Sequence, residues 1–143
     1  MKYSVELEVK LHRERVVELL TSHDNRRRWQ NGFIGHAPLD GEPGTVGATT
    51  QLTFRVGEQQ FEMIETILAK ELPEMYCVSY VSSQSASISK NSFFETQNGT
   101  TLWRVDMQMR VNGLYKIMAY FSANGFRNQT KHLMRSFADY AER

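Results

Sequence analysis

The sequence predicts an α+β domain in which an antiparallel sheet is covered by one long C-terminal helix. Segments between residues 2 and 111 repeatedly alternate apolar and polar side chains, which is the period of a half-buried strand. Short turns join most of these segments, so neighbouring strands should run antiparallel. After Gly113 the apolar residues recur every three or four positions, as on an amphipathic helix. At 143 residues the chain is expected to form a single domain, residues 1–143.

The N-terminal part should form one strand and two short helices. Apolar and charged residues alternate from Tyr3 to Leu11, and one face of that strand is therefore buried. From Arg13 the apolar residues fall on one side of a helix. Ser22 or Asp24 could cap a second short helix that runs through Trp29.

The middle of the chain reads as a series of hairpins. The run from Gly41 to Gly44 contains Pro where φ must be fixed and Gly where φ must be positive, which indicates a turn. Asn98-Gly99 is the strongest hairpin signal in the sequence. We expect strands at residues 51–56, 60–70, 75–82, 85–95 and 102–111.

The C-terminal region should be helical to its end. Asn124-Gly125 is expected to interrupt it, leaving a first segment at residues 114–121 and a longer second one. The second segment carries one apolar stripe, formed by Phe126, Thr130, Leu133, Phe137 and Tyr140. Since each strand has one apolar face, this helix is the only large element left to cover the sheet.

Composition limits the classes of function. The net charge is only +1, which argues against a dedicated nucleic-acid binder. The lone Cys77 cannot form an internal disulfide, so we expect a reducing, cytoplasmic location. No apolar stretch is long enough for stable membrane insertion. Eight Phe, six Tyr, two Trp and seven Met supply large apolar side chains for a packed core or a ligand cavity.

Several local motifs resemble one known superfamily. The segment Asp24 to Trp29 follows an opening strand and amphipathic helix, and it is similar to the family's stretch from Asp to Trp in the second short helix. The turn from Gly41 to Gly47 and the Gly99-Thr100-Thr101 run before Trp103 also fit. Together with the C-terminal helix, their order resembles the SRPBCC superfamily. It is also called START-like or birch-pollen-allergen-like, and it includes polyketide cyclases.

The resemblance implies a helix-grip architecture and an internal cavity. A curved antiparallel sheet would wrap around the C-terminal helix, two short helices after the first strand would close one end, and an apolar ligand would lie between sheet and helix. Under that architecture, we expect the cavity wall to include Phe54, Phe61, Met63, Tyr80, Phe94, Trp103, Met107, Met118, Phe121, Gln129, Leu133 and Phe137.

Two residues are weak candidates for acid–base chemistry. Glu65 shares strand parity with Phe61 and Met63, so it would be desolvated with a raised pKa if that face points inward. If the face of Ile64 is buried instead, Glu65 is simply solvated. His132 lies beside the apolar stripe and could reach a cavity rim, although a surface position is the plainer interpretation.

Other patterns favour no special chemistry. The four histidines show no helical metal spacing and no HExxH or CxxC pattern occurs, so we expect neither a metal site nor a cofactor. The run Arg26-Arg27-Arg28 reads as a solvated helix face, with an anionic lipid or nucleic-acid surface as the sharper alternative.

Three functional hypotheses remain open at this point. The leading one is binding or transport of a hydrophobic or amphipathic small molecule, lipid- or polyketide-like, by a monomer or homodimer. The second is an enzyme of the polyketide cyclase or hydratase kind with a buried acid–base residue. The third is a chaperone-activator-like interaction domain, which should have a filled interior and an outer apolar patch.

Overall fold

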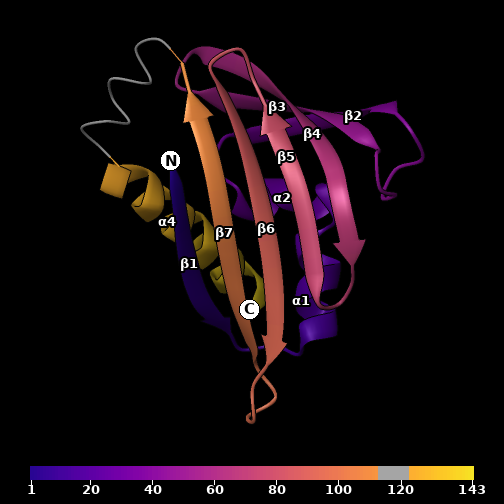
Figure 1. The fold of residues 1–143 in the computed structure, drawn as a ribbon, viewed down its shortest axis with the longest axis vertical. Helices are drawn as coiled ribbons and strands as arrows, with labels where there is room; N and C mark the ends of the chain where they lie inside the picture. Colours follow the sequence, from indigo (N-terminus) through magenta and orange to yellow (C-terminus); the bar gives the residue numbers. More distant parts are fainter. Residues whose placement is uncertain (113–122) are drawn as a thin grey trace.

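A computed structural model describes residues 1–112 and 123–143 of the chain (Figure 1). The helices and strands follow the order expected from the sequence, apart from one additional strand. They are β1 (Lys2–Val9), α1 (Arg13–Leu20), α2 (His23–Trp29), β2 (Phe33–Asp40), β3 (Thr49–Val56), β4 (Gln59–Glu71), β5 (Met75–Val81), β6 (Ser85–Glu95), β7 (Thr101–Val111) and α4 (Ala123–Ala141).

Within the described residues the strands form one seven-stranded sheet in the order β1-β7-β6-β5-β4-β3-β2. Every pairing is antiparallel, and all except β1 with β7 join strands that are consecutive in the chain. Figure 1 shows α4, α1 and α2 together on one face of this curved sheet. The predicted α+β helix-grip fold is therefore confirmed.

The strand that sequence reasoning missed is β2. Only Phe33 is buried, and the last five residues of the strand are exposed, so no apolar–polar alternation marks it. It is an edge strand, held to β3 by main-chain hydrogen bonds with two register shifts. Pro38 is tolerated there because an edge strand need not use every N–H group.

The buried core lies between the inner sheet face and α4. Phe137 is 0% exposed. Its ring centre lies 5.2 Å from that of Trp29 and 5.4 Å from that of Trp103, and both contacts are edge to face. Trp29 comes from α2 and Trp103 from β7, so this aromatic contact joins helix, helix and sheet. A smaller apolar group surrounds Leu52 at the β2–β3 end of the sheet.

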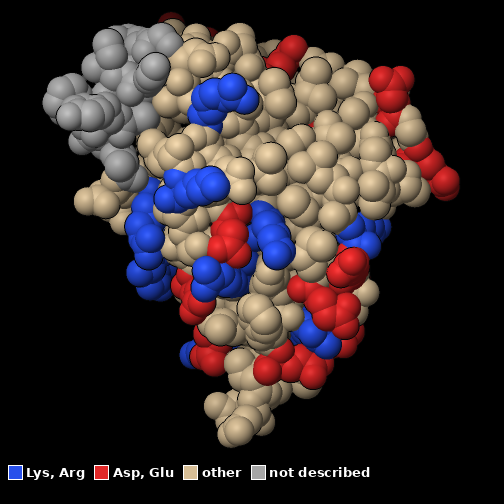
Figure 2. Space-filling view, viewed as in Figure 1, with Lys and Arg blue, Asp and Glu red and all other residues tan. Residues whose placement is uncertain are grey.

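The outer sheet face carries charges of both signs close together (Figure 2). Arg104 on β7 contacts Glu6 on β1 and Asp106 on its own strand, each at 3.0 Å. This group is solvent-exposed, so it adds little to stability. None of the helices in residues 1–112 and 123–143 is long and apolar enough to cross a membrane.

The structure contradicts one of the two expectations for the C-terminal region, and the other lies outside the described residues. Asn124 and Gly125 do not precede the long helix but lie within the first turn of α4, which begins at Ala123. The predicted helical segment at 114–121 lies outside the described residues.

Candidate functional site

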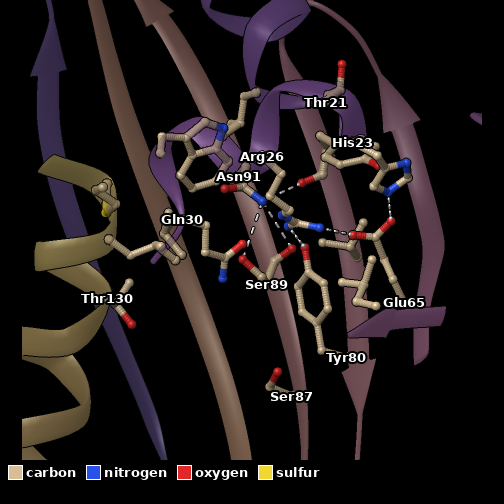
Figure 3. A pocket seen from close by; sticks show the side chains of 18 of the residues that line it. Thr21, His23, Arg26, Gln30, Glu65, Tyr80, Ser87, Ser89, Asn91 and Thr130 are labelled. Atoms are coloured by element: carbon tan, nitrogen blue, oxygen red, sulfur yellow. Dashed lines mark hydrogen bonds and ion pairs between the residues drawn. The ribbon is translucent and has the colours of Figure 1, made fainter. Parts of the chain in front are cut away.

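A cavity of about 190 Å³ lies between the sheet and the helices. Its apolar wall includes Leu52 from β3, Met107 from β7 and Leu133 from α4. Its polar wall is formed by α2 and the middle strands, and Figure 3 shows His23, Arg26, Glu65 and Tyr80 converging there. Polar and apolar side chains therefore share the lining, and Thr130 adds a hydroxyl on the α4 side.

The polar wall is organised around the carboxylate of Glu65. This side chain is 3% exposed, and its Oε2 accepts a hydrogen bond from Arg26 Nη1 at 3.0 Å. Its Oε1 lies 2.7 Å from Nε2 of His23. An ionised carboxylate can only accept, so Nε2 of His23 carries the proton in this contact. Arg26 Nη2 also donates to the Tyr80 hydroxyl at 3.1 Å.

The contacts of Glu65 determine its ionisation. Burial on its own would raise the pKa of this carboxyl, but the hydrogen bond from His23 and the charge of Arg26 outweigh it and lower the pKa to about 2. The expectation of a raised pKa is thus wrong. The inward orientation did occur, but the sequence did not show that two donors would meet the buried carboxylate.

Arg26 is enclosed by aromatic rings. Its guanidinium carbon lies 5.7 to 5.9 Å from the ring centres of Trp29, Phe33 and Tyr80. Burial opposes its charge, but Tyr80 and Glu65 more than compensate and raise the Arg26 pKa above its ordinary value. Burial raises the pKa of Tyr80 to about 12 against the effect of Arg26, so its hydroxyl stays protonated at neutral pH.

Small polar residues on β6 leave room for the cavity. Ser87, Ser89 and Asn91 occupy successive inward positions and all line it. Asn91 Oδ1 accepts a hydrogen bond from Trp103 Nε1 at 3.0 Å, and Asn91 Nδ2 donates to the Tyr76 carbonyl at 3.1 Å. Asn91 is therefore satisfied by protein groups, whereas no hydrogen bond involves the Ser87 hydroxyl within the described residues.

The structure places half of the expected cavity residues on this wall. They are Phe54, Met63, Tyr80, Trp103, Met107 and Leu133. Phe137 lies in the core behind the wall, where it contacts Trp103. Met118 and Phe121 lie outside the described residues.

Four predicted site residues lie elsewhere. Phe61 points to the inner side but sits near the end of β4, stacked on Phe54 and 44% exposed. Phe94 is 50% exposed because its even position on β6 turns it to the outer face. Gln129 and His132 occupy the exposed side of α4, beside Asn31 in a separate surface groove.

His23 and Arg26 line the cavity but were not among the residues predicted from the sequence. The interpretation of the arginine run as one solvated face is wrong for Arg26, whose side chain is 12% exposed; Arg28 is exposed as expected. A signal was present, because residues three apart on a helix share a face. His23, Arg26 and the buried Trp29 are spaced in this way.

Within residues 1–112 and 123–143, no group of three or more His, Cys, Asp or Glu side chains is arranged to hold a metal ion. The polar cluster includes one carboxylate and one imidazole, and the guanidinium of Arg26 occupies the remaining oxygen of Glu65. Both carboxylate oxygens of Glu65 are therefore occupied by donors of the protein itself.

This arrangement of a sheet around a helix, with a cavity between them, is the Bet v 1-like helix-grip fold. Solved structures similar to this chain include TTHA0849 from Thermus thermophilus, with a TM-score of 0.78, 8% identity and coverage of 99% of this chain and 97% of that one. Protein CV1439 from Chromobacterium violaceum has a TM-score of 0.77, 13% identity and the same coverage. Ara h 8.0201 has a TM-score of 0.76, 8% identity and again the same coverage. No family model matches the sequence, and no curated protein is detectably similar to it.

Proposed function

We propose that this protein binds a small amphipathic molecule in the cavity between the sheet and α4. The observation that carries the proposal is the cavity of about 190 Å³, with apolar lining and a few convergent polar groups. Apolar burial would supply most of the affinity, and the polar groups would orient the ligand. The helix-grip fold, which is known for ligand binding, supports the same proposal.

The test uses a panel of one- and two-ring aromatic compounds and medium-chain alcohols. A ligand that binds only the folded protein raises its melting temperature by mass action. We expect Ser87→Leu to abolish this rise, because the larger side chain fills the cavity from β6. Ser92→Leu is the matched control, since its even position places it on the outer face of the same strand.

Two results would contradict the proposal. One is a panel in which no compound stabilises the wild-type protein. The other is a stabilisation that Ser87→Leu leaves intact, because the ligand would then occupy another site. The interaction-domain hypothesis called for a filled interior, so the hollow interior counts against it.

A second candidate function, an enzyme that transfers protons, is favoured by the contact between His23 and Glu65. With a pKa of about 2, Glu65 is a poor acid or base at neutral pH. A buried carboxylate can nevertheless fix an imidazole in the tautomer that acid–base catalysis needs. The test is His23→Gln, which should remove turnover of a bound compound while its affinity is retained; unchanged turnover would eliminate this candidate.

A further inference from the structure

The charges around the cavity cancel. Among the described residues that line it, Arg26 is the only Lys or Arg and Glu65 the only Asp or Glu. They meet at 3.0 Å, and both side chains are almost removed from solvent. His23 is the only histidine among these lining residues, and it too contacts Glu65. The cation of this site is therefore already matched by an anion of the protein.

We propose that the cavity selects an uncharged, oxygen-bearing ligand, such as a phenol, an alcohol or a ketone, and excludes both carboxylates and ammonium ions. This inference rests on the proposed ligand-binding function and specifies its ligand class. It distinguishes the protein from a fatty-acid carrier, in which an unopposed cation would hold the acid group.

Exclusion of ions follows from the geometry of the pair. A ligand carboxylate that approached Arg26 would also approach Glu65, because the two side chains share a hydrogen bond. It would lose its hydration without gaining a free counter-charge, and burial of an uncompensated charge is strongly unfavourable. The same reasoning excludes an ammonium group, which would approach Glu65 and Arg26 together.

The polar wall suits a neutral oxygen instead. The hydroxyls of Ser87, Ser89 and Tyr80 line the cavity. Each hydroxyl can donate and accept, so together they match a ligand hydroxyl, which has one donor and two acceptor positions. The apolar side chains that also line the cavity, among them Leu52, Met107 and Leu133, would hold the hydrocarbon part. A ligand that combines a neutral hydroxyl with an apolar body therefore matches this lining.

The volume restricts the ligand to a small molecule. An engineered cavity of roughly 150 Å³ in another protein is large enough for benzene. This cavity measures about 190 Å³, so a ligand with one aromatic ring or two fused rings has the appropriate size. 2-Naphthol is a suitable neutral probe, and 2-naphthoate and 2-naphthylmethylammonium are its anionic and cationic counterparts.

Isothermal titration of the wild-type protein at pH 8 with these three probes tests the inference. We expect 2-naphthol to bind at least about tenfold more tightly than either ion, because neither ion recovers its lost hydration. Binding of 2-naphthoate or of the ammonium probe as tight as that of 2-naphthol would overturn the inference and leave the ligand-binding function standing. If none of the three probes binds, the proposed function fails together with it.

A pair of variants supplies an independent arm. Glu65→Gln leaves Arg26 unopposed, so the preference for 2-naphthol over 2-naphthoate should shrink or reverse. Glu62→Gln removes an exposed carboxylate from the same strand and should keep the wild-type preference. A folded Glu65→Gln protein with the wild-type preference would contradict the role assigned to the ion pair. If that variant does not fold, the three-probe comparison on the wild-type protein decides.

Discussion

Acid should destabilise this protein through one buried carboxylate. The ordinary pKa of Glu65 is 4.5, and its contacts with His23 and Arg26 lower it to about 2 in the folded protein. One pKa unit corresponds to 1.36 kcal/mol, so these contacts favour the folded state by about 3 kcal/mol. Glu65 is 3% exposed, so solvent screens this coupling little.

The direction in which stability changes with pH follows from which state of the protein binds the proton. Between pH 4.5 and 2 the unfolded chain binds a proton at this position that the folded protein does not. The stabilisation is therefore complete above about pH 5 and is lost as the pH falls toward 2. About 2 kcal/mol of it should be gone at pH 3.

Urea unfolding at pH 7 and pH 3 measures this loss. Between pH 7 and pH 3 the free energy of unfolding of the wild type and of Glu62→Gln should each fall by about 2 kcal/mol more than that of Glu65→Gln. The reason is that only Glu65→Gln lacks the buried carboxylate that takes up the proton. A direct measurement is the NMR titration of the Glu65 carboxyl carbon, which should show a midpoint below pH 3. A midpoint at or above 4.5 would refute the reasoning, because the carboxylate would then gain nothing from its two donors.

Three further predictions concern the core and the surface of α4. Phe137→Ala should lower the free energy of unfolding by about 3–5 kcal/mol, since loss of the fully buried ring leaves a cavity between two tryptophans. Urea unfolding measures this loss, with Arg135→Ala as the exposed control. Equal losses in the two variants would contradict the buried position of Phe137. Asn91→Ala should cost about 1–3 kcal/mol because the indole N–H of Trp103 loses its only acceptor in the described structure; a neutral effect would mean that another group replaces it. His132→Ala should change stability by less than about 0.5 kcal/mol and leave 2-naphthol binding intact, because the side chain is exposed outside the cavity; weaker binding would place His132 in the site after all.

The sequence predicted most of the fold because the buried faces of its strands are regular. The alternation in β3 and β7 locates both strands and their inward residues, among them Phe54 and Trp103. The edge strand β2 was missed for the corresponding reason. It buries only Phe33, and main-chain hydrogen bonds leave no trace in side-chain polarity.

The candidate site was only partly predictable. Parity offered two possible inner faces for β4, those of Glu65 and Ile64, and the structure buries Glu65 while Ile64 stays exposed. Which face points inward depends on where α2 and α4 lie, and that is a property of the whole fold. The arginine run shows the same limit, because successive residues within one helical turn point in different directions, so Arg26 is enclosed while Arg27 and Arg28 are exposed.

The sequence by itself determined an α+β class with an antiparallel sheet and a C-terminal helix, a nearly neutral chain and a supply of aromatic and Met side chains for the interior. These follow from local periodicity and composition, which need no knowledge of distant contacts. Tertiary structure alone decided that the interior holds a cavity and that its polar wall is an ion pair between residues 39 positions apart. Charges so far apart in the chain become partners only when α2 is placed against β4, and that placement turned a run of arginines and a buried glutamate into one electrically balanced site.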